Sequence, residues 1–199
     1  MNKIVIDKPL NNLIINDKIV YIKGRVSINK IDISNIKEGI IVLEDNASLI
    51  IHDIIDIEGI NGNLSIISNN NTNLDLGLGI SSKGKNTFNI INRLVGNNNK
   101  SNIKIRVVSE KYSHINMKLT GIIESNTKNN DYTEDIKYLN LYPETIICLP
   151  ELIVNSNDTV ANHLMSVGNV NEEELFYLES RGINKKDSIE MIKRGFLNI

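Results

Sequence analysis

The sequence predicts a mainly β protein with a short C-terminal α-helical hairpin, and three observations support this. Isoleucine and asparagine together make up about a third of the 199 residues. From residue 1 to about residue 160, short and mostly alternating apolar runs are broken by Asn, Asp, Gly or Ser, and after residue 170 the period becomes helical. Because Ile is β-branched and Asn tolerates tight turns, this composition suits many short strands joined by turns.

The predicted strands share β-branched residues at alternate positions. They lie at residues 3–6, 12–15, 19–22, 25–28, 40–43, 48–51, 64–67, 103–108, 116–123, 145–149 and 151–154. Two further apolar runs, at residues 10–15 and 87–94, are also compatible with short helices.

Two all-β architectures fit these strands: a sandwich or barrel, and a solenoid of stacked strands. No repeat of fixed period is visible in the sequence, so periodicity does not choose between them. Asparagine in successive turns favours a β-helix, because identical side chains can stack between its coils.

The C-terminal segment contains the start and stop signals of two helices. Asn171 is an expected N-cap before an acidic first turn, and Arg181-Gly182 is a typical helix end. Asn184 is expected to cap a second helix that ends at Gly195. We therefore divide the chain into a β core at residues 1–168 and a helical segment at residues 169–199.

Charge and composition exclude several classes of protein. The 22 Lys and Arg residues are balanced by 24 Asp and Glu residues, for a net charge of −2, which argues against a strongly basic nucleic-acid binder. Basic residues in the tail are offset by acidic ones, so docking to a protein is favoured over binding DNA.

No apolar run approaches the roughly 18–20 residues of a membrane span, and charge appears too early for a signal peptide. We therefore expect a cytoplasmic protein.

Two side chains are candidates for binding or redox chemistry. His163 lies between the last predicted strand and the first helix, and a histidine can ligate a metal or carry a proton, although a lone histidine is usually structural. Cys148 is the single cysteine, which excludes an intrachain disulfide and any multi-cysteine metal motif. It lies in an apolar strand, where a cysteine is normally an inert small hydrophobe.

Three other motifs give weaker evidence for a catalytic or nucleotide-binding site. Asp53, Asp56 and Glu58 form an acidic stretch, and paired carboxylates are what glycoside cleavage requires. The Gly77-Leu78-Gly79 run lacks the third glycine of a dinucleotide fingerprint, because Ser82 stands at that position. Gly84-Lys85 is followed by Asn instead of Ser or Thr, so a phosphate-binding loop is not indicated either.

The last fifty residues resemble the C-terminal region of the SufB/SufD family, the scaffold subunits of the Suf iron–sulfur assembly machinery, and the resemblance is closer to SufD. The residues that carry it are Pro150-Glu151-Leu152, Asp158, His163, Val167-Gly168, the run Glu174-Leu175-Phe176-Tyr177-Leu178-Glu179-Ser180-Arg181-Gly182-Ile183, Met191-Ile192 and Gly195-Phe196. Upstream the match is looser, and residues 1–90 resemble the family only in their general pattern of short strands and turns.

The resemblance implies a right-handed parallel β-helix whose C-terminal helices dock on a SufC-like ATPase. The family's interface histidine corresponds to His163, and Phe176, Tyr177, Arg181, Gly182 and Phe196 are the ATPase-docking candidates. Cys148 is a weaker ligand candidate. The implied cofactor is a transient iron–sulfur cluster shared with a SufB-like subunit or a second copy of this chain, with none bound by this chain alone.

The sequence also departs from the family. Leu164 and Met165 replace small residues beside His163, and Ala161 stands where some members have a cysteine. SufB's sulfur-accepting cysteine has no counterpart in the region 135–138. The usual N-terminal helical domain has no counterpart, and the chain stops soon after Gly-Phe, so ATPase docking is expected to be partial or altered.

Three functions follow as hypotheses. The favoured one is a non-catalytic, SufD-like scaffold subunit that works with an ATPase and a second scaffold subunit. The alternatives are a small β-helix protein acting on carbohydrate and a purely structural oligomerisation module.

Overall fold

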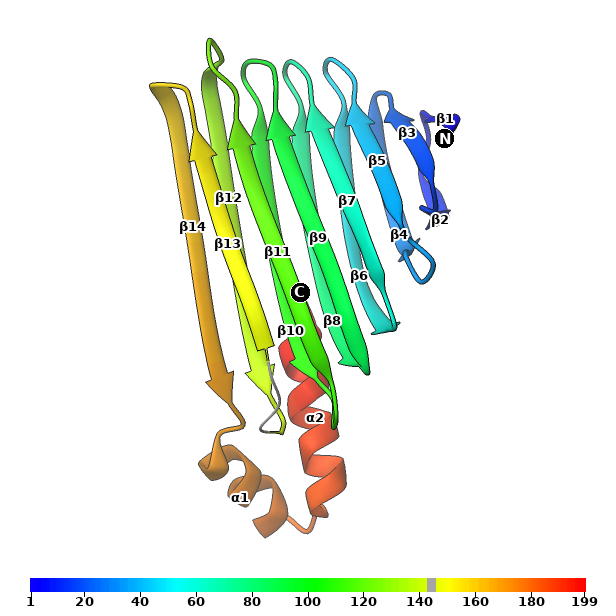
Figure 1. Ribbon diagram of the computed structural model, residues 1–199. Helices are drawn as coiled ribbons and strands as arrows, with labels where there is room; N and C mark the ends of the chain where they lie inside the picture. The colour runs from blue at the N-terminus through cyan, green and yellow to red at the C-terminus, as the bar shows by residue number, and fades with distance from the viewer. Residues whose placement is uncertain (143–145) are drawn as a thin grey trace.

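The computed structural model describes residues 1–142 and 146–199, which form a parallel β-solenoid followed by two helices (Figure 1). The strands are β1 (Asn2–Ile6), β2 (Leu10–Ile14), β3 (Lys18–Ile22), β4 (Arg25–Asp32), β5 (Glu38–Leu43), β6 (Ser48–Glu58), β7 (Asn61–Ser68), β8 (Asn73–Lys83), β9 (Lys85–Leu94), β10 (Lys100–Ser109), β11 (His114–Ile123), β12 (Lys128–Asn140), β13 (Ile146–Val154) and β14 (Asp158–Asn169). The helices are α1 (Glu172–Ser180) and α2 (Lys185–Leu197). The first residue of the strand predicted at 145–149 lies outside the described residues.

The strands form two facing seven-stranded sheets. The odd-numbered strands make one sheet and the even-numbered strands the other, and each strand pairs in parallel with the strand two places along the chain. Figure 1 shows the chain rising in the near sheet and descending in the far sheet as it advances from right to left, so the coil is right-handed. The parallel β-helix implied by the family resemblance is confirmed, and the sandwich alternative is excluded.

The solenoid widens from its N-terminal to its C-terminal end. The register separates paired residues by 16 positions between Asn2 and Lys18 but by 31 positions between Ile115 and Ile146. Strand length follows, from 5 residues in β1 to 13 in β12. Because the coil length grows steadily, no fixed repeat is visible in the sequence.

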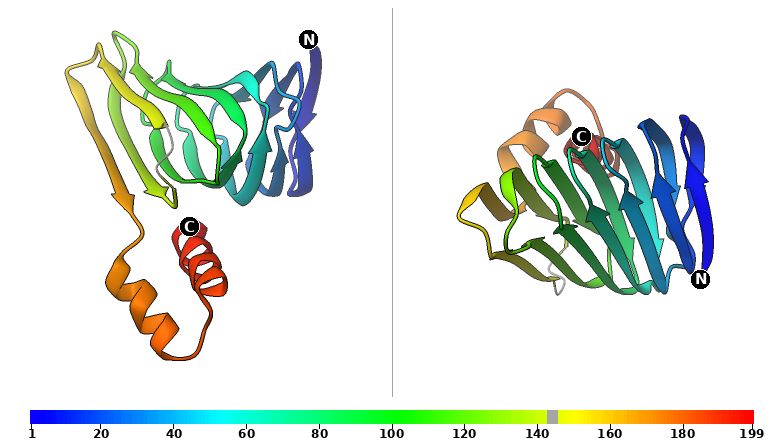
Figure 2. Two further views of the ribbon diagram at one scale, coloured as in Figure 1. Left: turned by 60° about the horizontal axis from the view of Figure 1, so that its bottom comes forward. Right: turned by 90° about the horizontal axis from the view of Figure 1, so that it is seen from above.

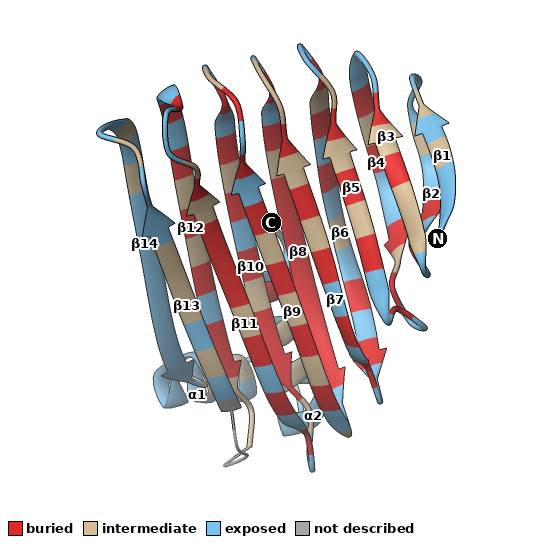
Figure 3. Ribbon diagram, turned by 45° about the horizontal axis from the view of Figure 1, so that its top comes forward, coloured by how far each residue is buried: buried red, intermediate tan, exposed pale blue. Residues whose placement is uncertain are grey.

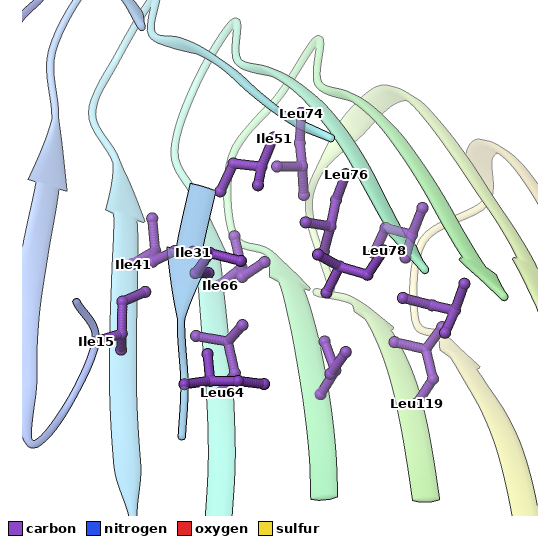
Figure 4. Close-up of a cluster of buried hydrophobic side chains, with 14 of the residues drawn as sticks. Ile15, Ile31, Ile41, Ile51, Leu64, Ile66, Leu74, Leu76, Leu78 and Leu119 are labelled. Carbon is purple, nitrogen blue, oxygen red and sulfur yellow. The ribbon is translucent and has the colours of Figure 1, made fainter. Parts of the chain in front are cut away.

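Alternating apolar side chains fill the space between the sheets. One continuous core extends from β2 through β12, and Leu64, Ile66, Leu76 and Leu78 are among its fully buried members. Figure 4 shows these side chains pointing toward one another from both sheets, and Figure 3 shows the alternation of buried and exposed residues along each strand. Burying each such side chain contributes roughly 1.5–3 kcal/mol, so the core is the main source of stability.

Asparagines stack along one turn of successive coils. Asn46, Asn71, Asn98 and Asn129 all have left-handed φ, between 55° and 65°. Each amide donates to the preceding one, over 3.2 Å from Asn71 to Asn46, 3.0 Å from Asn98 to Asn71 and 2.9 Å from Asn129 to Asn98. The predicted stacking of asparagine between coils is confirmed, and we call these four residues the asparagine ladder.

The two C-terminal helices contact each other, and their predicted caps are confirmed. Asn171 accepts a hydrogen bond from the Glu173 amide, and Asn184 accepts one from the Asp187 amide. Gly195 does not end the second helix as predicted, because α2 continues to Leu197. Packing of this last turn against the solenoid outweighs the weak helix preference of glycine.

Helix α2 lies on the outer face of the even-numbered sheet, whereas α1 extends away from it (Figure 2). Leu197 is buried against Val108 and Leu139, and Lys193 forms an ion pair with Glu110. The glycines of the Gly77-Leu78-Gly79 run face this helix end. A Cβ on Gly79 would lie 2.4 Å from the Leu197 carbonyl oxygen, so the run is a docking platform for the chain's own C-terminus.

Two further local predictions are wrong. The runs at 10–15 and 87–94 are strands β2 and β9, because parallel pairing with neighbouring coils decides the structure of short apolar runs. His163 lies within strand β14 and not between the last strand and the first helix. No helix in the two described ranges is long and apolar enough to cross a membrane.

Candidate functional site

The C-terminal end of the solenoid is open. β13 and β14 are the last strands of their sheets, and within the described residues each pairs on one side only. Exposed apolar side chains lie on both strands, and Figure 3 shows that most of β14 is exposed. These side chains are Ile147, Leu149, Ile153, Val154, Val160, Leu164, Met165 and Val167. Long apolar strand edges are normally covered by another chain, so this end has the character of an interface.

His163 lies at this open end. It pairs in register with Glu134 of β12, so the two side chains project from the same face of the sheet. Its Nδ1 lies 4.0 Å from Glu134 Oε1, and half of the imidazole surface is exposed while the Glu134 side chain is fully buried. His163 therefore links the solvent at the open end to a carboxyl group in the interior.

Glu134 is an unusual core residue. Its Oε2 accepts a 2.6 Å hydrogen bond from the buried Tyr132 hydroxyl, whereas Oε1 has no hydrogen-bond partner among the described residues. Burial raises the pKa of Glu134 to about 7, although the Tyr132 hydrogen bond acts in the opposite direction. Tyr132 packs over Gly121 of the facing sheet, where a Cβ would lie 2.4 Å from the phenol ring.

Cys148 belongs to the opposite wall of the same end. It pairs in register with the buried Met117, and it is half-buried against the core. Burial raises the pKa of the Cys148 thiol, and the neighbouring Tyr138 side chain only partly offsets this. The chain alone therefore favours the neutral thiol, which is a poor metal ligand until another charge stabilises the thiolate.

The described residues at the open end do not by themselves form a metal centre. Among residues 1–142 and 146–199, no group of three or more His, Cys, Asp or Glu side chains is arranged to hold a metal ion.

The acidic stretch on β6 lies in a different coil from the open end. Asp53 accepts 2.8 Å hydrogen bonds from the backbone amides of Ile31 and Ile54, so its carboxylate links β6 to β4 beyond their last paired residues. Asp56 and Glu58 lie exposed on the outer face of the strand. The structure thus gives Asp53 a structural role and leaves no buried pair of carboxylates in this stretch.

The docking candidates on the helices occupy two different environments. Phe176 and Tyr177 of α1 are 72% and 56% exposed, and the Arg181 guanidinium lies 5.2 Å from the centre of the Tyr177 ring. Gly182, with φ of +85°, turns the chain between the helices. Phe196 instead packs partly buried on the Val108–Leu139–Leu197 cluster.

An apolar groove lies between the two helices, with a volume of about 460 Å³. It is lined by Asn171, Glu173, Glu174, Tyr177, Leu178, Met191 and Ile192. None of the residues of α1 is buried. The groove beside this helix is therefore open to a partner.

Sequence reasoning missed Tyr132 and Glu134. The signal was present, because alternation in the run 130–138 places Tyr132, Glu134, Ile136 and Tyr138 on one face, where a glutamate among apolar side chains stands out. The contact with His163 has no such signal, since it depends on a pairing between residues 29 positions apart.

The fold and this end define a β-solenoid protein with an exposed apolar edge, one half-exposed histidine, a helix docked on the solenoid and a second helix that projects from it. The family model for the SufBD core domain of SUF-system FeS cluster assembly matches residues 83–196, which is more than half of the chain. The chain belongs to the SufBD family of the SUF iron–sulfur cluster assembly system.

Shorter segments match curated relatives. The iron–sulfur cluster assembly protein SufD of Escherichia coli K12 is 40% identical over 47 residues, and that of Bacillus subtilis 168 is 42% identical over 48, each covering 24% of this chain and 11% of the relative. An iron–sulfur cluster assembly SufBD family protein of Methanothermobacter thermautotrophicus Delta H is 39% identical over 54 residues, covering 27% of this chain and 13% of the relative. The alignments thus span only a small part of these relatives' length.

Proposed function

We propose that this chain is a non-catalytic, SufD-like scaffold subunit that supports iron–sulfur cluster assembly in the cytoplasm. The observation that carries the proposal is the open end of the solenoid, where the family's interface histidine, His163, lies among exposed apolar side chains. Family membership supports a role in iron–sulfur cluster assembly, and the exposed apolar strands beside His163 support an interface at this end of the solenoid.

A second scaffold subunit would cover the β13 and β14 edges. In this arrangement, backbone groups at the free edges pair with the partner, and the apolar side chains of both strands become buried. The partner also completes the ligand set, because His163 and the half-buried Cys148 provide too few ligands for a cluster. A SufB-like subunit and a second copy of this chain are the two partners that fit.

The helices would dock on a SufC-like ATPase. Phe176 and Tyr177 provide exposed aromatic anchors on α1, Arg181 is held against Tyr177, and Gly182 sets the angle between the helices. Phe196 would act indirectly, by holding α2 on the solenoid.

Affinity purification of the full chain from its native host tests both contacts. We expect a SufC-like ATPase and a second SufBD-family subunit to copurify, and we expect Phe176→Ala to reduce recovery of the ATPase only. Recovery of neither partner would contradict the proposal. Light scattering of the chain, alone and with a SufC-like ATPase, distinguishes a purely structural oligomerisation module, whose size would not increase when the ATPase is added.

His163→Ala tests the ligand role within the purified complex. We expect the complex to assemble but to lose transfer of a cluster to an acceptor apoprotein, because imidazole is a suitable iron ligand. His114→Ala is the matched control, since His114 is exposed on β11 in a different coil from β14. Unchanged transfer by His163→Ala would exclude the ligand role.

A further inference from the structure

The pair formed by His163 and Glu134 includes a buried carboxyl oxygen that lacks a hydrogen bond among the described residues. Buried polar atoms are nearly always hydrogen-bonded, yet Glu134 Oε1 is fully buried without a partner among the described residues. The register places Nδ1 of His163 4.0 Å from this oxygen.

The other carboxyl oxygen is already fixed. Tyr132 donates its hydroxyl proton to Glu134 Oε2 over 2.6 Å, and Tyr132 is itself locked between the sheets over Gly121. The carboxyl group therefore cannot rotate freely, and Oε1 stays directed toward β14. The separation exceeds a hydrogen bond by about 1 Å, a gap that a small rotation of the half-exposed imidazole closes.

A neutral imidazole carries one proton, and the hydrogen bond at one nitrogen decides which nitrogen keeps a lone pair. If Nδ1–H donates to Glu134, then Nε2 keeps its lone pair and faces away from the interior. Histidine ligands in metal sites commonly have this arrangement, with a carboxylate or carbonyl holding the second nitrogen.

We infer that Glu134, held by Tyr132, is a positioning residue that fixes the Nδ1–H tautomer of His163 and leaves Nε2 as the atom available at the open end. The use of Nε2 as an iron or cluster ligand rests on the proposed function. The tautomer itself is a property of this chain and can be measured without iron, cluster or partner.

The test is the ¹⁵N–¹H correlation spectrum of the histidine side chains in the full chain, at about pH 8.5, where an ordinary imidazole is neutral. Protonated and unprotonated ring nitrogens have well-separated ¹⁵N shifts, and His163→Gln identifies the signals of His163. His52 is an internal reference, because its Nε2 and not its Nδ1 lies 3.1 Å from Asp75 Oδ2. We expect His163 to show the Nδ1–H tautomer and His52 the opposite one.

Variants at Glu134 then test the cause. In Glu134→Gln, Tyr132 still donates to the carbonyl oxygen, so the amide NH₂ faces Nδ1 and we expect His163 to change to the Nε2–H tautomer. In Glu134→Leu we expect a mixture of tautomers, with His52 unchanged in both variants.

An Nε2–H tautomer of His163 in the unmodified chain overturns the inference, and this reading needs no variant to fold. A tautomer that is the same with Glu, Gln and Leu at position 134 overturns it as well. Loss of cluster transfer is a separate measurement, so a failed ligand role and a failed positioning role remain distinguishable.

Discussion

At the scale of single residues, asparagine has two distinct uses in this chain. The four residues of the asparagine ladder are exposed, occupy left-handed turns and link neighbouring coils through their amides. Buried asparagines instead bind the backbone, as Asn99 does for the Thr72 amide over 2.9 Å and Asn130 for the Asn99 amide over 3.0 Å. Composition alone suggested turns, and only the structure separates the two uses.

Substitution of Asn98 tests the ladder. Asn98→Ala removes two amide hydrogen bonds and forces a Cβ-bearing residue without local compensation to keep φ near 57°. We expect a loss of about 1–2 kcal/mol in the free energy of unfolding, measured by urea denaturation. Asn98→Gly removes the same bonds but accepts this φ, so its loss should be less than about 1 kcal/mol. Equal stabilities of the two variants would contradict a contribution from backbone conformation.

The site illustrates the limit of prediction for single residues. His163 was predicted from its place in a family motif, and the structure places it at the open end. Its setting in β14 was not predicted, because residues 158–169 are mostly exposed and show no clear alternation of apolar and polar residues. This strand is held by its backbone pairing with β12, which leaves little trace in its own sequence.

At the scale of elements, the strands were predictable and their stacking was not. Alternating Ile and Val identified most strands, because each has one face toward the core. Stacking depends on which residues pair, and the distance between pairs changes at nearly every coil, from 21 positions between Ile19 and Ile40 to 29 between Lys85 and His114. The helix caps were predicted correctly because capping is local, whereas the end of α2 depends on its docking.

Gly79→Ala tests the docking of α2. The added methyl group would collide with the Leu197 carbonyl oxygen, so we expect the last turn of α2 to lift from β8 while the solenoid stays folded. Hydrogen exchange of residues 193–198 should accelerate about tenfold, which corresponds to about 1.4 kcal/mol of lost local stability. Gly168→Ala is the matched control, since its Cβ meets no atom within 4 Å. Unchanged exchange in Gly79→Ala would show that this contact does not hold the helix.

At the scale of the whole molecule, the two ends of the solenoid differ in strand length, in exposed apolar surface and in the side chains that they carry. The C-terminal end has the longer strands, the exposed apolar side chains of β13 and β14, His163 and the projecting helix α1. The N-terminal end has the short strands β1 and β2. Association with a second scaffold subunit is therefore expected at the C-terminal end.

A charge placed at each end tests this difference. Val167→Lys puts an ammonium group among the apolar side chains of β14, and we expect binding to a second SufBD-family subunit to weaken by at least about tenfold in calorimetry. Val5→Lys on β1 is the control, because Val5 is 59% exposed and Val167 is 53% exposed. Equal weakening by both substitutions would contradict an interface confined to the C-terminal end.

The gradual widening of the coils also limits how copies of this chain can join. A head-to-tail contact would set the 5-residue strands β1 and β2 of one copy against the 9- and 12-residue strands β13 and β14 of the next. Much of the longer edge would then stay unpaired, so such a contact is disfavoured relative to one between two wide ends. A contact between two wide ends pairs strands of equal length, so the taper favours joining like ends over a head-to-tail stack.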